Sequence, residues 1–236
     1  MKRELLAKLI ADRAAKRSVA LVTNLADGAQ TLVYTEGAVP GLPTPLVGTV
    51  RQSIQDNESQ TVEIEGAGRW FIEVLNPPLR LIVVGAVHIA QPLAQMAAIA
   101  GYDVSIVDPR ASFATDARFP GVTLVDEWPD DALKKLDPDR RTAVVTLTHD
   151  PKLDDPALAV ALKSDAFFIG SLGSRRTHAT RLQRLKDMGF KEAETARIHG
   201  PVGLNIEAIT PAEIAISILA QVIAVLHKKV EEQVPA

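Results

Sequence analysis

The chain has 236 residues, of which 47% are hydrophobic and 23% charged, and it contains no cysteine. This composition is typical of a folded globular protein, long enough for one large domain or a main domain with a small partner. Without cysteine, disulfides, thiolate metal sites, iron–sulfur clusters and a cysteine nucleophile are excluded, and a reducing, cytoplasmic location is expected. The net charge of −3 comes without a block of Lys or Arg, so we expect no nucleic-acid partner.

Neither end of the sequence reads as a membrane or export segment. Residues 1–17 alternate charged and apolar residues without an uninterrupted apolar run, so they predict an amphipathic helix rather than a secretory signal. The apolar stretch Ile214–Leu226 is interrupted by Ser217 and Gln221 and is shorter than the roughly 20 residues of a membrane span. We therefore expect no membrane-crossing segment.

Residues 1–76 predict a small α+β domain. Val19–Leu25 and Gln30–Tyr34 alternate in the manner of strands around Asp27-Gly28, a dipeptide that favours a tight hairpin turn. A loop rich in Pro and Gly is expected at residues 37–45, followed by strands at 61–66 and 69–75. Asn76-Pro77-Pro78 predicts a stiff linker, because proline fixes its own φ and restricts the residue before it.

Residues 79–236 predict a Rossmann-like α/β domain with a doubly wound parallel sheet. Continuous apolar runs are typical of strands that are buried on both faces, and here helical segments separate them. The final helix is expected from Pro211 to about Lys229, with Thr210 as its N-cap. The expected strands are residues 79–84, 103–107, 122–125, 142–147 and 166–170, and the helices between them are 88–101, 129–136, 155–164 and 174–189.

Ligands of such sheets bind outside the carboxyl ends of the strands. After the first strand, Gly85 begins a turn that resembles the dinucleotide pattern, but Val87 stands where a glycine normally lets the backbone approach a pyrophosphate. Asp108 ends the second strand 23 positions after Gly85, where an acid would accept ribose hydroxyls; the alternative is a turn cap beside Pro109. Arg110 follows and could meet a phosphate.

Thr148-His149-Asp150 follows another strand. His149 beside a carboxylate could donate a hydrogen bond or shuttle a proton, because histidine titrates near neutrality. The alternative is that Asp150 begins a turn with the next proline and His149 only packs. No second histidine stands at a metal-binding spacing, so no metal site is predicted. His178 is expected to lie exposed on a later helix.

The segment Gly170–Arg176 predicts an anion site. Its glycines leave backbone N–H groups accessible, and the helix that follows begins with partial positive charge. Arginine at a helix start opposes that charge, which favours a phosphate in front of it, although such arginines are also found solvated or paired with acids. The contributing residues are Gly170, Ser171, Gly173, Ser174, Arg175 and Arg176.

Five stretches together resemble the Rossmann domain of the xanthine dehydrogenase accessory factor family, the XdhC/CoxI type. Gly-Ser-Arg-Arg followed by Pro-Val-Gly-Leu and a Thr-Pro-x-Glu-Ile-Ala helix start are the most specific features. Two departures stand out: this chain has Gly-Ala-Val-His at Gly85–His88 where the family usually shows Gly-Ala-Gly-His, and the short N-terminal unit lacks a cysteine-bearing glycine-rich segment. The matching stretches are residues 81–94, 104–120, 144–158, 167–182 and 200–225.

The resemblance implies a chaperone that binds molybdenum cofactor, protects it, supports its sulfuration and delivers it to a xanthine dehydrogenase-type molybdenum hydroxylase apo-enzyme. Because this chain has no cysteine, the sulfur would come from a separate donor such as a cysteine desulfurase. A homodimer through the apolar final helix is expected. The cofactor-binding residues would be Gly85, His88, Asp108, Arg110, Thr148, His149, Asp150, Gly170, Ser171, Gly173, Ser174, Arg175 and Arg176.

Two other functions fit the same residues. One is an NAD(P)-dependent oxidoreductase, with Gly85, Ala90 and Asp108 at the cofactor and His149 as acid or base; Val87 counts against it. The other is a regulatory nucleotide-sensing module, in which the anion site binds a free nucleotide. The fold alone does not separate these functions.

Overall fold

The computed structural model describes residues 3–227. The chain divides into two compact units, Met1–Pro77 and Pro78–Ala236. Within the described residues, no helix combines the length and the apolar character that crossing a membrane requires.

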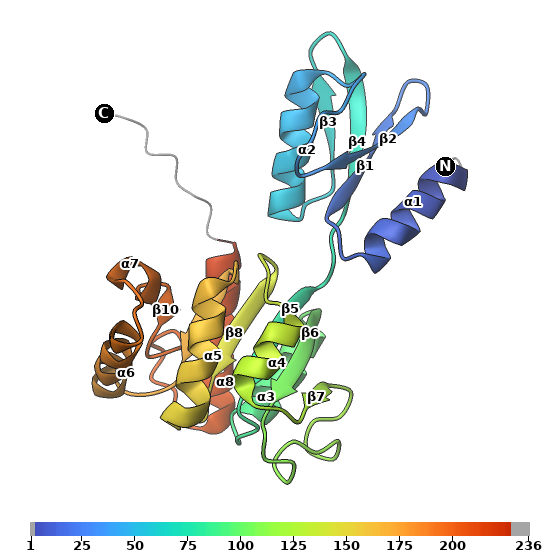
Figure 1. The fold of residues 1–236 in the computed structure, drawn as a ribbon. Helices are drawn as coiled ribbons and strands as arrows, with labels where there is room; N and C mark the ends of the chain where they lie inside the picture. Colours follow the sequence, from blue (N-terminus) through green and yellow to red (C-terminus); the bar gives the residue numbers. More distant parts are fainter. Residues whose placement is uncertain (1–2, 228–236) are drawn as a thin grey trace. The chain divides into compact units, whose positions relative to one another are not determined.

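The first unit is a four-stranded antiparallel sheet in the order β2-β1-β4-β3 (Figure 1). Ala20 and Val22 on one face of the sheet pack against α2, while Val19 and Leu21 on the other face form a cluster that includes Leu5 and Leu9 of α1. The elements are α1 (Arg3–Ala14), β1 (Val19–Asn24), β2 (Gln30–Tyr34), α2 (Thr44–Asp56), β3 (Gln60–Ile64) and β4 (Gly68–Leu75).

Helix α2 corrects the loop expected at residues 37–45. The loop ends at Pro43, and Thr44 and Pro45 already belong to the first turn of the helix, where proline is tolerated because its missing N–H would have no helical partner. Leu46, Val50 and Ile54 recur every four residues and are buried against the sheet. That spacing was the available sequence signal for the helix.

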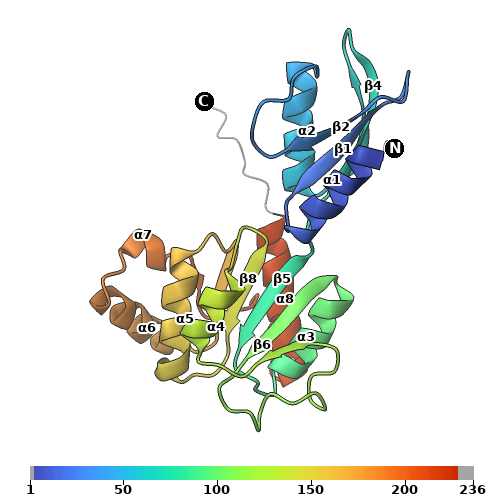
Figure 2. The same ribbon diagram turned by 45° about the vertical axis from the view of Figure 1, so that its right-hand side comes forward.

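The second unit is a six-stranded parallel sheet in the order β10-β9-β8-β5-β6-β7, which confirms the expected fold class (Figures 1 and 2). The final helix is described to Leu226, and the rest of its expected length, to Lys229, lies outside the described residues. The elements are β5 (Leu79–Val84), α3 (Ala90–Ile99), β6 (Tyr102–Val107), β7 (Thr123–Val125), α4 (Pro129–Leu136), β8 (Thr142–Thr146), α5 (Pro151–Lys163), β9 (Phe168–Ser171), α6 (Arg175–Asp187), α7 (Glu192–Thr195), β10 (Ile198–His199) and α8 (Pro211–Leu226).

Helices cover both faces of this sheet. Leu81 and Val83 of β5 face the cluster that contains α3 and α8, while Ile82 and Val84 face the cluster that contains α4, α5 and α6. Because successive side chains of a strand point to opposite faces, a strand covered on both sides is apolar at most of its successive positions. This is the physical reason for the continuous apolar runs in the sequence.

The Pro-Val-Gly-Leu segment braces the end of β9. The Val202 N–H donates to the Ser171 carbonyl at 3.1 Å, and a Cβ added at Gly170 would lie 2.5 Å from the Val202 side chain. The Gly203 N–H donates to Gln221 of α8 at 2.7 Å. The segment therefore joins α8 to the strand from which the Gly-Ser-Arg-Arg loop begins.

Gly85 allows the turns after β5 and β8 to touch. Its φ is +108°, and a Cβ there would lie 2.6 Å from Thr148 Cγ2 and 3.3 Å from the Thr148 nitrogen. Gly101 also has a positive φ, +87°, but a Cβ there would meet no atom within 4 Å. Both glycines relieve backbone strain, and Gly85 also makes room for a neighbour.

We predict that Gly85→Ala lowers the free energy of unfolding by about 3 kcal/mol, because backbone strain and overpacking add at this position. Gly101→Ala, the matched control, should lose only about 1 kcal/mol from the strain alone. Urea unfolding of the two variants and the wild type measures both losses. Equal losses in the two variants would contradict the close contact between Gly85 and Thr148.

Candidate functional site

The candidate residues gather at the carboxyl edge of the parallel sheet. Strands β9, β8, β5 and β6 are neighbours in that order, so the loops that follow them are neighbours too. Gly85 packs on Thr148, and the buried hydroxyl groups of Thr146 and Ser171 share a hydrogen bond. The fold thus brings the four sequence motifs to one edge.

Asp108, at the end of β6, is fully buried. Its Oδ2 accepts hydrogen bonds from the Ala86 N–H at 2.8 Å and from Arg110 Nη2 at 2.7 Å. Its Oδ1 accepts from the backbone N–H and Nε of Arg110, at 3.0 and 2.8 Å. Burial would raise the pKa of Asp108, but the hydrogen bonds from Arg110 and Ala86 outweigh it, so the pKa is lowered. A ribose contact by Asp108 stays a prediction, and its carboxylate already fixes the turn after β5.

A cavity of about 390 Å³ lies beside this turn. It is lined by Val87 and His88 from the turn and by Ser112, Phe113 and Arg118 from the segment after β6. The Arg110 guanidinium lies over the Phe113 ring, 4.4 Å from its centroid. This cavity has the size and mixed lining of a small-molecule site.

The loop after β8 holds His149 exposed in a strained backbone conformation. Its φ is +61°, a region that costs energy for a residue with a side chain. Asp150 caps α5, since its Oδ1 accepts from the Lys152 N–H at 2.9 Å. The Asp150 N–H in turn donates to Thr148 Oγ1 at 3.0 Å. Asp150 therefore begins helix α5 rather than a turn, the helix expected at residues 155–164 starts already at Pro151, and the side chain of His149 is exposed.

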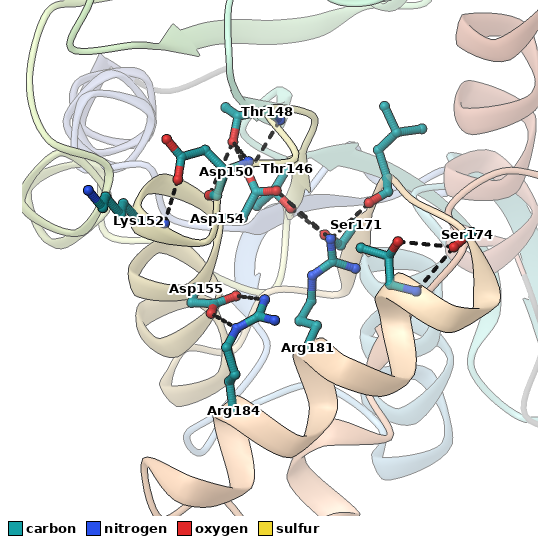
Figure 3. Close-up of polar contacts among 12 residues, drawn as sticks. Thr146, Thr148, Asp150, Lys152, Asp154, Asp155, Ser171, Ser174, Arg181 and Arg184 are labelled. Atoms are coloured by element: carbon teal, nitrogen blue, oxygen red, sulfur yellow. Dashed lines mark hydrogen bonds and ion pairs between the residues drawn. The ribbon is translucent and has the colours of Figure 1, made fainter.

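A buried pair that the sequence did not reveal lies behind these loops (Figure 3). Asp154 is 1% exposed, and its Oδ1 accepts from the Thr148 hydroxyl at 2.7 Å and from the Thr148 N–H at 3.3 Å. Burial raises the pKa of Asp154, although the Thr148 hydrogen bonds and the Arg181 charge oppose this. Arg181 is also 1% exposed, with Nη2 3.9 Å from Asp154 Oδ2.

The loop after β9 presents unpaired donors. Ser174 caps α6, because its hydroxyl accepts from the Thr177 N–H at 3.1 Å. Arg175 and Arg176 are exposed, and within residues 3–227 neither makes an ion pair. The N–H groups of Gly173, Ser174 and Arg175 have no acceptor in that same part of the chain. This arrangement suits an anion.

His178 corrects a sequence expectation. It was expected to be exposed on α6, but it is half-buried, and its ring occupies the space that a side chain at Gly200 would need. Its Nδ1 is buried, and no described residue bonds to it. Burial and the nearby Arg181 charge lower the pKa of His178. The ring therefore packs against Gly200, in surroundings that favour its neutral form.

Residues 81–222 match the family model described as the XdhC Rossmann domain. The match covers more than half of the chain, and this chain belongs to that family. The resemblance seen in the sequence is thereby confirmed.

The curated relatives include a protein named as a molybdenum cofactor insertion chaperone and one named as a probable xanthine dehydrogenase subunit. The molybdenum cofactor insertion chaperone PaoD of Escherichia coli K12 is 35% identical over 160 residues, which are 67% of this chain and 44% of PaoD. A probable xanthine dehydrogenase subunit of Bacillus subtilis 168 is 32% identical over 154 residues, 65% of this chain and 44% of that protein. The uncharacterized protein YqeB of E. coli K12 is 37% identical over 164 residues, 68% of this chain and 30% of YqeB. This chain thus spans less than half the length of these relatives.

A solved structure has the same fold. The crystal structure of a xanthine dehydrogenase from Bacillus halodurans superimposes with a TM-score of 0.71 at 24% identity. The match covers 95% of this chain and 67% of the other.

We predict that Arg110→Met lowers the free energy of unfolding by about 2 kcal/mol at pH 7, because the buried Asp108 loses its charged partner. Water already screens part of the interaction, since the Arg110 side chain is 41% exposed. The folded-state pKa of Asp108 is lowered, so its stabilising contribution is complete above the ordinary value of 3.8 and is lost as the pH falls below it.

The difference between Arg110→Met and the wild type should therefore be constant while Asp108 is ionised in both folded proteins. It should shrink as the pH falls through the folded-state pKa of Asp108, first in the variant, where burial is no longer opposed by Arg110, and then in the wild type. Urea unfolding across a pH series measures it. Lys135→Met removes an exposed partner of Glu127 and should change little at any pH. A difference for Arg110→Met that persists unchanged into acid would show that the ion pair with Asp108 is not its cause.

Proposed function

We propose that this protein is a maturation factor that binds molybdenum cofactor and delivers it to a molybdenum hydroxylase apo-enzyme. The observation that carries the proposal is the group of free N–H donors at Gly173–Arg175 beside two unpaired arginines. Family membership supports it, and so does a relative named a molybdenum cofactor insertion chaperone. This chain spans less than half of that relative's length, so the complete activity, both binding and delivery, is part of the proposal.

The residues present fit a pterin that carries a phosphate or pyrophosphate. A phosphate in front of α6 would accept hydrogen bonds from the N–H groups of Gly173 and Ser174 and meet the guanidinium groups of Arg175 and Arg176. The ring system would use the cavity beside His88 and Phe113. The cofactor is cargo here, and its molybdenum would be used by the enzyme that receives it.

The handling of sulfur requires another protein. A chain with no cysteine neither carries a persulfide nor binds molybdenum through a thiolate. We propose that a separate donor, such as a cysteine desulfurase, supplies sulfur to the bound cofactor. We also propose that the protein acts in the cytoplasm.

A homodimer through α8 is a further part of the proposal. Ile216 and Ile223 stand seven residues apart, on one face of α8, and both are exposed. An apolar helix face gains free energy when a partner covers it. Sedimentation velocity tests this part, and a monomer at all concentrations would remove it.

The oxidoreductase alternative finds less support in the site. The Ala86 N–H and Asp108, which would face a dinucleotide, bond to each other, and Val87 lines the cavity. A nucleotide-sensing module would use the same anion site after β9. Binding of NADH or a free nucleotide in preference to molybdenum cofactor would favour one of these alternatives.

We predict that changing both Arg175 and Arg176 to Ala weakens molybdenum cofactor binding by about 3 kcal/mol, roughly two hydrogen bonds to charged groups. The salt dependence of binding should fall as well. Single Arg→Lys changes should recover part of the affinity, since lysine keeps the charge but lacks the planar fork. Cofactor retention by the soluble variants across a salt series measures this.

The matched control for the arginine pair changes Lys134 and Lys135 to Ala, which removes the same charge from the last turn of α4. The control should retain cofactor as the wild type does. Unchanged retention in the Arg175 and Arg176 double variant would place the phosphate elsewhere and reject this site.

We predict that His149→Ala impairs activation of the client enzyme by about a hundredfold, the lower end of what a positioned proton donor or acceptor contributes. His149 is exposed at a strand end in a strained conformation, so its removal should leave the fold intact. His149→Asn, which keeps a polar side chain in the same backbone conformation, separates the imidazole from the turn. Wild-type activation by His149→Ala would show that the histidine has no part in delivery.

A further inference from the structure

Arg181 holds the loop after β9 from below. It lies on α6, and its Nη2 donates to the Leu172 carbonyl at 2.8 Å (Figure 3). The same nitrogen lies 3.7 Å from the position that a Cβ at Gly173 would occupy. Gly173 has a φ of +146°, so only glycine adopts this conformation readily. The buried guanidinium of Arg181 is thus in close contact with the backbone of the loop after β9.

This hydrogen bond sets the direction of the next N–H group. The peptide bond between Leu172 and Gly173 is trans, and in a planar trans peptide the C=O and the following N–H point in opposite directions. Because Arg181 holds the Leu172 oxygen toward the protein interior, the Gly173 N–H must point away from Arg181. That N–H has no acceptor within residues 3–227, as expected of a donor that is available to a ligand.

Asp154 connects the same arginine to the loop after β8. It receives both the N–H and the hydroxyl of Thr148, the residue directly before the strained His149. Asp154 Oδ2 lies 3.9 Å from Arg181 Nη2. One buried pair therefore links the backbone next to His149 with the backbone next to Gly173.

The buried pair of Asp154 and Arg181 contains polar atoms without hydrogen-bond partners among the described residues, which does not favour stability. Asp154 Oδ2 and the Nε and Nη1 atoms of Arg181 are buried, and no described residue bonds to them. Buried charges with unsatisfied atoms cost free energy, and apolar replacements of such pairs are often as stable. One turn later on α6, Arg184 makes a two-bond ion pair with Asp155, so the same helices also carry a well-satisfied pair.

We propose that Arg181 and Asp154 are positioning residues of the ligand site, which fix the loops after β8 and β9 in one arrangement and turn the Gly173 N–H toward a bound phosphate. The inference rests on the proposed function, because it assigns the phosphate to the same loop. Neither residue touches the ligand. Their contribution is the fixed direction of donors that do.

The test uses the full chain, labelled with ¹⁵N and titrated with inorganic pyrophosphate. The Gly173 amide signal and the dissociation constant are followed by NMR, and thermal stability is measured on the same samples. Arg181→Met should weaken pyrophosphate binding about tenfold and remove the Gly173 response, since one hydrogen bond no longer sets the peptide direction. Arg181→Lys should restore part of both, because one ammonium N–H can still reach the Leu172 carbonyl.

Two further variants separate positioning from folding. Asp154→Asn combined with Arg181→Met removes both charges but keeps an acceptor for Thr148. This double variant should fold stably, and its affinity for pyrophosphate should be as low as that of Arg181→Met. Arg184→Met breaks the neighbouring pair with Asp155 and should bind pyrophosphate as the wild type does, whatever its thermal stability.

Wild-type affinity and a wild-type Gly173 response in the stable double variant would overturn the inference, as would a wild-type protein whose Gly173 amide ignores pyrophosphate. A wild type that binds pyrophosphate at Gly173, with the expected losses in the variants, supports it. If that protein then fails to bind molybdenum cofactor, the proposed function fails while the positioning role stands.

Discussion

Two buried carboxylates, Asp108 and Asp154, hold the carboxyl edge of the parallel sheet together. Each is almost completely inaccessible to water, accepts a backbone N–H from one strand-end loop and lies close to an arginine. A buried carboxylate without partners is costly, so each one constrains the loop that supplies its donors. The positions of the exposed site residues follow from these two constraints.

The loops around Asp108 and the loop after β9 differ in whether their arginine side chains are bonded within the protein. Around Asp108, the N–H groups of Gly85 and Ala86 and the guanidinium of Arg110 are bonded within the protein, while the Val87 and His88 N–H groups have no acceptor among the described residues. In the loop after β9, the N–H groups of Gly173 to Arg175 and the side chains of Arg175 and Arg176 remain unbonded in the described structure. In a dinucleotide-binding Rossmann domain the first of these places carries the pyrophosphate. We place the anion at the second and leave the cavity beside Val87 for the less charged part of the ligand.

The sequence predicted the elements whose burial pattern is simple. Strands covered on both faces are mostly apolar, so β5, β6, β8 and β9 were found, and Thr210 with Pro211 marked the start of α8. Helix α2 was missed because prolines and glycines before it indicated a loop. The two-residue strand β10 was missed because two residues are too few to show the alternating pattern of a strand.

Part of the arrangement of the candidate site also followed from the predicted strands. Residues directly after strands were identified by position, and the fold brings Gly85, Thr148 and Gly173 to one edge. Asp154 and Arg181 could not be found, because each lies inside a helix where charged residues are normally solvated, and only tertiary packing buries them. His178 was wrongly expected to be exposed, since Gly200 creates the space for its ring from a distant part of the chain.

The most direct test of the central claim is a crystal structure of the protein with molybdenum cofactor bound. We predict phosphate oxygens about 3 Å from the backbone nitrogens of Gly173 and Ser174, with Arg175 or Arg176 completing the contact. A phosphate bound instead at the turn Gly85–His88, or a cofactor that contacts neither loop, would contradict it.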